Sequence, residues 1–224
     1  MSKEEKFIEI YNQCKEFTMT SKERMRALYG AVEHIIRLDI PGDFVECGVW
    51  RGGSSMLVAL SLVEFNEMNR KIYLYDTFKG MSKPSSRDFR VVDRSLLAGK
   101  KWEQKKAKGY NKWCFSPLSE VKKNMTLTGY PQDKLIFIKG EVEKTIPNTI
   151  PKKIAILRLD TDWYESTKHE LIHLFPRVSE NGVIIIDDYG YWAGSKKAVD
   201  EYFTDNSIPM NMIDDSGRMG LKIS

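Results

Sequence analysis

The sequence has no hydrophobic run long enough to cross a membrane. Its longest unbroken apolar run, Met56 to Leu60, has five residues, whereas a membrane-spanning helix needs roughly 20. The first fifteen residues are charged and lack the apolar stretch and small-residue cleavage site of a secretory signal. We therefore expect a cytoplasmic protein that makes no contact with a membrane.

Cysteine and histidine are also scarce, with three of each. Cys14, Cys47 and Cys114 are widely spaced and form no C-x-x-C pair, which leaves no recognisable zinc or dithiol motif. No Ser-His-Asp order is evident, and the three histidines fall in helical patterns. The sequence therefore argues against covalent catalysis and predicts reduced, structural cysteines.

A strong net charge is absent as well, because 35 basic and 31 acidic residues leave only +4. This charge is too small for the whole chain to be a nucleic-acid binder, so nucleic acid is not an expected partner. The distribution is uneven, since residues 82–116 hold ten basic and three acidic residues. The basic residues are Lys83, Arg87, Arg90, Arg94, Lys100, Lys101, Lys105, Lys106, Lys108 and Lys112, and the acidic ones are Asp88, Asp93 and Glu103.

This basic stretch, residues 82–116, has the pattern of neither a strand nor a long helix. It is longer than the roughly 12–15 residues of most structureless loops, and it interleaves Trp102, Tyr110 and Trp113 with lysines. We interpret it as a lid or acceptor-recognition insertion. Two binding roles stay open, a lid over an anionic sugar and contact with RNA, beside a solvated loop that binds nothing.

Short apolar strands alternate with helical patterns along the rest of the chain. Both faces of each strand are apolar, which is typical of a parallel sheet covered by helices on both sides. The predicted strands are 44–47, 72–75, 135–138, 154–157 and 183–186, and helices are predicted at 21–38 and 55–65 and through 171–175 and 198–203. The predicted fold class is therefore α/β, with a doubly wound sheet.

The length of 224 residues favours a single domain, residues 1–224. Residues 1–40 form a helical region, and we expect its amphipathic helix to pack on a second copy of the chain in a homo-oligomer. Residues 210–223 contain two short runs around Asp215-Ser216-Gly217, which is typical of a closing β-hairpin.

Acidic residues stand where the predicted strands end. Glu46, Asp76, Asp160 and the pair Asp187-Asp188 each close an apolar run, and Gly140 closes another. In a doubly wound sheet, ligands bind outside the carboxyl ends of the strands, where loops and helix amino termini converge. The sequence therefore predicts a ligand site built around these carboxylates.

Glycines follow the first of these strand ends in the spacing G-x-x-x-G-G, at Gly48, Gly52 and Gly53. Glycines between a strand and a helix let a ligand approach the backbone closely. The spacing matches neither the dinucleotide fingerprint nor a P-loop. A tight turn required by helix packing explains the glycines equally well.

Asp76 ends the next strand, at the position where doubly wound folds hold ribose hydroxyls. Its two acceptor oxygens suit a vicinal diol. Capping of a helix is the alternative role for this carboxylate.

Four carboxylates, those of Asp160, Asp162, Asp187 and Asp188, end two strands that we expect to be neighbours. Like charges packed together usually have a cation or a raised pKa to explain them. An all-oxygen set points to Mg²⁺ or another hard divalent ion, because no cysteine or histidine is supplied for zinc. Solvated acids paired with Lys196, Lys197 or Arg158 are the alternative.

Five segments carry a resemblance to a known family. The strings are GDFVECGVWRGGSS, LYDTFKGM, FIKGEVEKTIP, LRLDTDWYEST and GVIIIDDYGYWAGSKKAVDEYF. In this order they resemble the macrocin O-methyltransferase (TylF) family of S-adenosylmethionine-dependent, metal-dependent enzymes, which methylate sugar hydroxyls. The resemblance runs from about Thr20 to the carboxyl end and is weak in residues 82–116.

The resemblance implies a Rossmann-like methyltransferase fold and S-adenosylmethionine as the cofactor. It implies that the cofactor is bound by Glu46, Gly48, Trp50, Arg51, Gly52, Gly53, Ser54, Asp76, Phe78, Gly140, Glu141 and Asp160, with Asp76 at the ribose and Gly140 and Glu141 at the adenine. It further implies that Asp160, Asp187 and Asp188 hold Mg²⁺. The layout is also similar to metal-dependent catechol methyltransferases.

A metal-assisted methyl transfer accounts for these residues chemically. A divalent ion lowers the pKa of an acceptor hydroxyl, and a neighbouring carboxylate can accept its proton. Asp160 is our first candidate for this base and Asp162 the second. The lysine that catechol methyltransferases carry after the first acid has no equivalent at positions 163–165.

The predicted function is therefore Mg²⁺-dependent O-methylation of a small-molecule acceptor, a sugar or glycosylated compound. The alternatives are a metal-dependent nucleotide-sugar glycosyltransferase and an RNA methyltransferase. A metal phosphohydrolase and a non-catalytic binding module would use the same carboxylates.

Overall fold

A computed structural model of the chain describes residues 2–92, 98–204 and 208–223. Within these residues the main sheet has seven strands in the order β5-β2-β1-β6-β7-β9-β8. The strands are β1 (Asp43–Cys47), β2 (Ile72–Asp76), β5 (Leu135–Lys139), β6 (Ile154–Leu159), β7 (Val178–Ile186), β8 (Met210–Met212) and β9 (Arg218–Leu221). The first five are parallel, β9 is antiparallel to β7, and β8 is antiparallel to β9. The predicted doubly wound α/β fold is confirmed.

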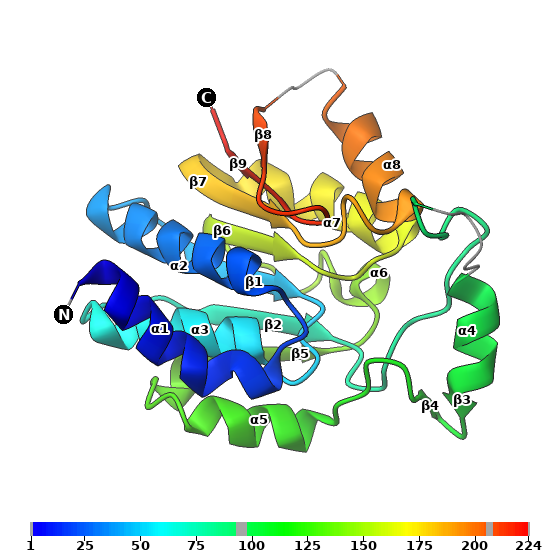
Figure 1. Cartoon of the computed structure of the whole chain (residues 1–224), viewed down its shortest axis with the longest axis horizontal. Helices are drawn as coiled ribbons and strands as arrows, with labels where there is room; N and C mark the ends of the chain where they lie inside the picture. Colours follow the sequence, from blue (N-terminus) through cyan, green and yellow to red (C-terminus); the bar gives the residue numbers. More distant parts are fainter. Residues whose placement is uncertain (1, 93–97, 205–207, 224) are drawn as a thin grey trace.

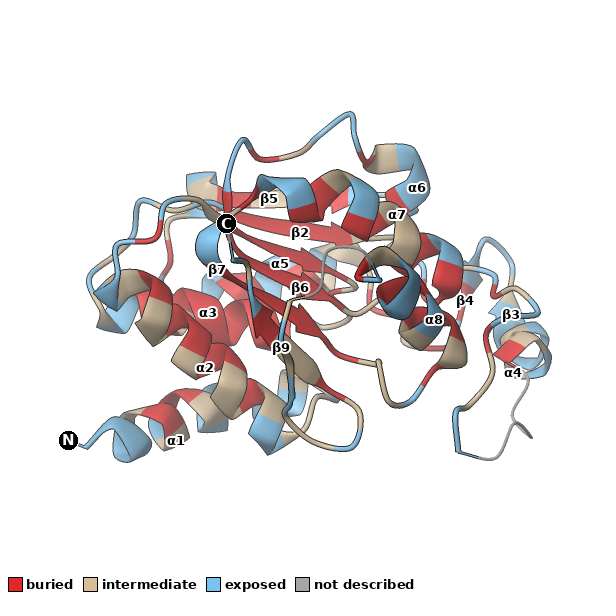
Figure 2. Cartoon of the chain, turned by 90° about the horizontal axis from the view of Figure 1, so that it is seen from above, coloured by how far each residue is buried: buried red, intermediate tan, exposed pale blue. Residues whose placement is uncertain are grey.

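Helices cover both faces of the sheet (Figure 1). One face carries α1 (Lys3–Cys14), α2 (Lys22–Arg37), α3 (Gly53–Glu64) and α5 (Leu118–Thr126), and the other carries α6 (Val142–Thr145), α7 (Tyr164–Leu174) and α8 (Ala193–Tyr202). Three short 3₁₀ turns, η1 (Lys15–Phe17), η2 (Gln132–Lys134) and η3 (Phe175–Arg177), join these elements. Figure 2 shows that the strands are buried between the two layers.

The amino-terminal helices bury their apolar faces within the chain itself. Phe7 and Ile10 of α1 and Met25 and Leu28 of α2 belong to the same core as α3. Ser2 caps α1 in a reciprocal pair with Glu5. The amphipathic pattern of this helical region is thus explained by packing on the sheet layer, and the homo-oligomer stays a prediction.

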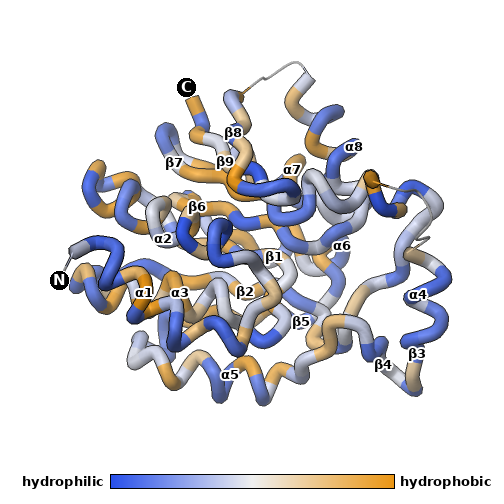
Figure 3. The backbone as a smooth tube through the Cα atoms, in the orientation of Figure 1, coloured by the Kyte–Doolittle hydropathy of each residue, from blue (hydrophilic) through white to orange (hydrophobic). Residues whose placement is uncertain are grey.

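The described residues of the 82–116 stretch lie beside the carboxyl ends of the parallel strands (Figure 1). They contain a short helix, α4 (Ala98–Lys105), and two two-residue strands, β3 (Lys106–Ala107) and β4 (Tyr110–Asn111), that pair with each other. The prediction of no strand was wrong in this detail, because strands of this length leave no periodic pattern. Figure 3 shows that α4 is mostly hydrophilic. Asp93 and Arg94 lie outside the described residues.

The predicted closing hairpin is present as β8 and β9, with Gly217 directly before β9. No helix in the described part of the chain combines the length and the apolar character needed to cross a bilayer.

Candidate active site

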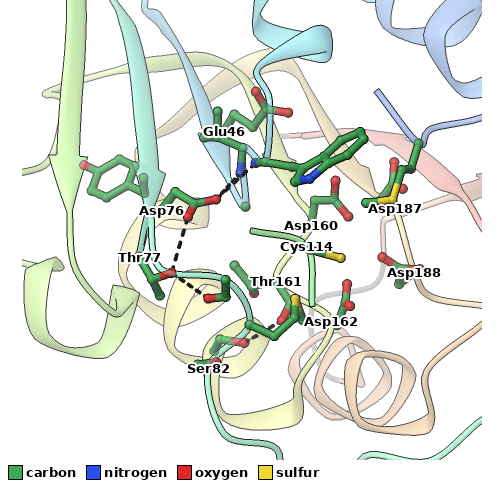
Figure 4. A pocket seen from close by; sticks show the side chains of 18 of the residues that line it. Glu46, Asp76, Thr77, Ser82, Cys114, Asp160, Thr161, Asp162, Asp187 and Asp188 are labelled. Atoms are coloured by element: carbon green, nitrogen blue, oxygen red, sulfur yellow. Dashed lines mark hydrogen bonds between the residues drawn. The ribbon is translucent and has the colours of Figure 1, made fainter. Parts of the chain in front are cut away.

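A cavity of about 420 Å³ opens at the carboxyl ends of the parallel strands. Its wall comes from the ends of all five parallel strands, from the segment before α2 and from residues of the 82–116 stretch. Figure 4 shows Asp76 and Thr77 on one side of the cavity and Asp160, Asp162 and Asp188 on the other. The acids that end the predicted strands thus share one cavity.

The turn after β1 requires glycine at its first position. Gly48 has φ +85°, and a Cβ atom there would overlap the carbonyl oxygen of Asp160. Gly53 is equally confined, since a Cβ would lie 2.7 Å from the Phe17 carbonyl oxygen. Both residues line the cavity. The glycines that the tight turn after β1 requires are therefore also part of the cavity wall.

The other residues predicted in this turn divide into two groups. Trp50 and Ser54 line the cavity, whereas the structure does not bring Arg51 and Gly52 to it. The Nε atom of Arg51 donates to Glu120 Oε1 at 2.8 Å. Gly52, at φ +93°, precedes α3 and faces α5 instead of the cavity.

Asp76 accepts three backbone hydrogen bonds. Its Oδ2 accepts from the amides of Val49 at 2.8 Å and Trp50 at 3.1 Å, and its Oδ1 accepts from the amide of Phe78 at 2.6 Å. Burial raises the pKa of Asp76, although these amides act in the opposite direction. Asp76 therefore joins two loops and does not cap a helix start, which disfavours capping as its role.

Phe78 contributes to this site only through its backbone. Its side chain is 2% exposed and packs in the core of the α1–α3 layer. Gly140 and Glu141 do line the cavity, and the Gly140 amide donates to the Asp76 carbonyl at 2.9 Å. The Glu141 carboxylate pairs with Lys144 Nζ at 2.5 Å.

Arg158 is buried behind the acidic side of the cavity and pairs with three of its carboxylates. Its guanidinium is 1% exposed, and Nη1 donates to Glu46 Oε1 and to Asp160 Oδ2, both at 2.7 Å. The other nitrogen, Nη2, donates to Asp187 Oδ1 and to the Thr20 hydroxyl. Burial raises the pKa of Glu46 although Arg158 opposes this. Glu46 thus lines the cavity while it neutralises a buried arginine.

Asp160, Asp187 and Asp188 form one carboxylate cluster, with an oxygen of each within 4.8 Å of the others. Arg24 of α2 donates to the second oxygen of Asp187. Burial and the neighbouring aspartates raise the pKa values of Asp160 and Asp188, although Arg158 acts in the opposite direction on Asp160. The oxygen donors fit a hard divalent cation such as Mg²⁺.

Asp162 lies next to this cluster and hydrogen-bonds Asp188. Burial, reinforced by the charge of Asp160, raises the pKa of Asp162 to about 7. The predicted alternative of surface pairing applies only in part, since Arg158 pairs with Asp160 and Asp187. Lys196 and Lys197 pair instead with Asp200 and Glu201 of α8.

The basic residues of the 82–116 stretch mostly face away from the cavity. Among the described ones, Lys101 lines it, with Nζ 4.0 Å from the centroid of the Trp113 ring. The lysines that are exposed to solvent are Lys83, Lys100, Lys105, Lys106, Lys108 and Lys112. The cavity therefore gains little positive charge from this stretch.

Trp113 of the predicted lid packs at the cavity edge against two tryptophans, Trp163 and Trp192, to which the sequence analysis gave no role. The ring centroids of Trp113, Trp163 and Trp192 lie 5.1–5.9 Å apart. Trp113 comes from the 82–116 stretch, whereas Trp163 and Trp192 follow β6 and β7. Cys114 also lines the cavity and is not simply a core residue, although burial raises its pKa to about 12.

Solved structures define the class to which this fold and cavity belong. The O-methyltransferase NovP superposes with a TM-score of 0.81 and 30% identity over 93% of this chain and 83% of NovP. The calicheamicin methyltransferase CalS11 shares the fold, with a TM-score of 0.70 and 18% identity over 99% of this chain and 93% of that chain. The protein has the Rossmann-like fold of O-methyltransferases.

The chain belongs to the macrocin-O-methyltransferase (TylF) family, whose sequence profile matches residues 13–219. It is 34% identical over 202 residues, 89% of this chain and 73% of the relative, to the 8-demethyl-8-(2,3-dimethoxy-alpha-L-rhamnosyl)-tetracenomycin-C 4'-O-methyltransferase of Streptomyces olivaceus. It is 32% identical over 187 residues, 83% of this chain and 69% of the relative, to the mycinamicin III 3''-O-methyltransferase of Micromonospora griseorubida. The protein is therefore an O-methyltransferase, and this favours the main prediction over a glycosyltransferase or an RNA methyltransferase.

Proposed function

We propose that the protein is a divalent-metal-dependent, S-adenosylmethionine-dependent O-methyltransferase that acts on a hydroxyl of a sugar or glycosylated small molecule. The observation that carries this proposal is the shared cavity of Asp76 and the Asp160, Asp187 and Asp188 cluster. One side of the cavity suits a nucleoside, and the other suits a cation and a hydroxyl.

The methyl donor would bind along β1, β2 and β5. Asp76 would accept a hydrogen bond from a ribose hydroxyl through Oδ1, because Oδ1 accepts from one backbone amide whereas Oδ2 already accepts from two. Gly48 and Gly53 line the space proposed for the methionine part, and their lack of side chains lets the Asp160 and Phe17 backbones pack against this turn. Gly140 and Glu141 border the space for the adenine.

Asp160, Asp187 and Asp188 would hold the metal ion, with Mg²⁺ the expected ion. A divalent ion bound there supplies positive charge that lowers the pKa of an acceptor hydroxyl. Arg158 holds one oxygen each of Asp160 and Asp187, and Arg24 holds the second oxygen of Asp187. Asp160 and Asp188 therefore offer the carboxylate oxygens of the cluster that no arginine engages.

Asp162 is the carboxylate best suited to accept the proton. Asp160 is paired with Arg158 and belongs to the proposed metal-binding cluster. Asp162 lies next to this cluster and also lines the cavity. The acceptor oxygen would form a bond to the donor methyl carbon as the carbon–sulfur bond breaks, and its proton would pass to Asp162. The products are a methyl ether and S-adenosylhomocysteine, and orientation by the cavity would supply much of the rate.

A sugar acceptor is supported by two observations. The name of the Streptomyces olivaceus relative specifies 4'-O-methylation of a rhamnosyl compound, and that of the Micromonospora griseorubida relative specifies 3''-O-methylation of mycinamicin III. The acceptor side of the cavity presents aromatic walls, Trp113, Tyr191 and Trp192, and such rings pack well on the carbon–hydrogen faces of sugars. In this proposal, residues 82–116 act as the acceptor-recognition lid of a single domain.

Titration calorimetry with S-adenosylhomocysteine, with and without Mg²⁺, tests the donor site. We expect micromolar binding to the wild type and binding weaker by about ten-fold or more in Asp76→Ala, because the ribose loses its acceptor. Asp43→Ala is the matched control, since Asp43 accepts from the Lys71 amide at the start of β1, at the opposite end from the cavity. Absence of binding to the wild type under every condition would contradict the proposal.

A further inference from the structure

Glu170 of α7 is a fully buried carboxyl group, 0% exposed, that the proposed chemistry does not use. Its Oε1 accepts a hydrogen bond from the hydroxyl of Thr161 at 3.0 Å. Its Oε2 has no hydrogen-bond partner. Glu170 lies on the buried side of α7, where Leu171 and Leu174 of the same helix are also fully buried.

Thr161 stands between the two carboxylates on which the proposed chemistry depends. Before it, the Asp160 amide donates to the Cys47 carbonyl at 2.8 Å. After it, Asp162 adopts a left-handed backbone with φ +70°, and the Trp163 amide closes the turn on the Thr161 carbonyl at 2.8 Å. The direction of both carboxylates therefore depends on how Thr161 is held.

A carboxyl group at position 170 is unfavourable for folding alone. Burying a polar group without full hydrogen bonding costs free energy, and one oxygen of Glu170 makes no hydrogen bond. A leucine would fill the site without this cost. Residues that break a packing rule in this way are found where function requires them.

We infer that Glu170 is a positioning residue whose carboxyl group holds the Thr161 hydroxyl and thereby fixes how Asp160 and Asp162 face the cavity. The inference rests on the proposed function, because it assigns a consequence to the metal-binding role of Asp160. It predicts that loss of this carboxyl group leaves the stability of the fold unchanged but weakens metal binding at the acidic side of the cavity.

The test compares Mn²⁺ affinity, S-adenosylhomocysteine affinity and thermal stability in the full chain, each by calorimetry. The variants are Glu170→Leu, Glu170→Gln, Thr161→Val and Thr161→Ser. Thr128→Val is the matched control, since it removes another buried threonine hydroxyl, which donates to the Met125 carbonyl at 2.8 Å in the turn after α5.

We expect Glu170→Leu and Thr161→Val to weaken Mn²⁺ binding by about 10-fold or more, as loss of a group that orients a metal ligand usually does. Their S-adenosylhomocysteine affinity stays unchanged, and the melting temperature of Glu170→Leu stays within about 3 °C of the wild type or rises. Glu170→Gln keeps an acceptor and Thr161→Ser keeps the donor, so both retain Mn²⁺ affinity. Thr128→Val lowers the melting temperature only.

Wild-type Mn²⁺ affinity in both Glu170→Leu and Thr161→Val would overturn the inference. If Glu170→Leu does not fold, Thr161→Val against Thr161→Ser decides alone. A wild type that binds S-adenosylhomocysteine but no Mn²⁺ would also overturn it, because the loop would have no metal ligand to orient. A wild type that binds Mn²⁺ but no S-adenosylhomocysteine would contradict the proposed donor site and leave the Mn²⁺ comparison valid.

Discussion

Gly48 and Gly109 share the same backbone angle, φ +85°, but differ in their surroundings. A Cβ at Gly48 would overlap the Asp160 carbonyl oxygen, whereas nothing lies within 4 Å of a Cβ at Gly109. Alanine at either position has to adopt an unfavourable left-handed backbone. Only the alanine at position 48 would also clash with the Asp160 carbonyl oxygen beside the cavity.

We therefore predict that Gly48→Ala destabilises the chain by about 3 kcal/mol or more, through backbone strain and overpacking together. Gly109→Ala should cost only about 1–2 kcal/mol, the strain alone. Urea unfolding of both variants measures the difference. Equal losses would mean that the turn after β1 can move away from β6.

Asp162 gives the metal-free protein a defined pH dependence. Burial raises its pKa to about 7 in the folded chain, above the value of about 3.9 in an unfolded chain. The folded chain thus holds this proton more tightly. The contribution of this proton to the free energy of unfolding is fully present below about pH 4 and is lost as the pH rises through about 7.

In EDTA, the free energy of unfolding of the wild type relative to Asp162→Asn should fall by more than about 1 kcal/mol between pH 4 and pH 8. Urea unfolding at several pH values measures it. Asp200→Asn serves as the control, since Asp200 is an exposed partner of Lys196 on α8. A constant difference between wild type and Asp162→Asn would show that Asp162 ionises normally.

At the scale of elements, α2 and the turn before β9 are joined through one arginine. Arg24 Nε donates to Asp214 Oδ2 at 2.9 Å, and its Nη1 donates to Asp187. Ser21, the cap of α2, donates to the same Asp214 oxygen at 2.5 Å. The start of α2 is therefore fixed to the cavity and to the carboxyl-terminal hairpin together.

Arg24→Met should loosen the segment before α2, which lines the cavity at residues 17–20. We expect amide hydrogen exchange in residues 17–25 to become about ten-fold faster or more, as local opening becomes easier. Arg26→Met is the control on the same helix, since Arg26 pairs with exposed Glu4 of α1. Equal exchange in the two variants would contradict a special role for Arg24.

The five parallel strands were predictable because each is a short apolar run between turn residues. The sequence missed the first half of β7, since Ser179, Glu180 and Asn181 are polar at its solvent-exposed start. The acidic cluster was also predictable from the sequence. Its carboxylates follow β6 and β7, and these two strands are neighbours in the sheet. Local pattern and topology were sufficient for these features.

Long-range contacts account for what could not be predicted. Arg24 meets Asp187 across 163 positions, and Trp163 donates to the Ser82 carbonyl across 81. No periodicity encodes such pairs, so neither Arg24 nor the tryptophan cluster was identified. The family resemblance placed Arg51, Gly52 and Phe78 at the cofactor, but packing turns them toward α5 or the core.

At the scale of the whole molecule, carboxylates gather at the cavity, and among the described lysines of the 82–116 stretch only Lys101 lines it. Ligands that bring positive charge into the cavity should therefore stabilise the entire fold. Binding to the folded state alone adds about 2.7 kcal/mol at a ligand concentration of 100 times Kd.

Saturating Mg²⁺ should raise the melting temperature of the wild type by about 5–10 °C relative to EDTA. The shift should disappear in Asp188→Asn, which removes one carboxylate of the cluster, while S-adenosylhomocysteine still stabilises that variant. Differential scanning calorimetry measures both shifts. A full Mg²⁺ shift in Asp188→Asn would locate the ion elsewhere.

The contact of Arg24 with both Asp187 and Asp214 also sets the order in which the site can be completed during synthesis. The ribosome makes Arg24 first and Asp214 only after every parallel strand has been made. A nascent chain can thus assemble the five parallel strands before the arginine has both of its partners. A polypeptide that stops before Asp214 would carry these strands without the contact that fixes the start of α2 beside the cavity.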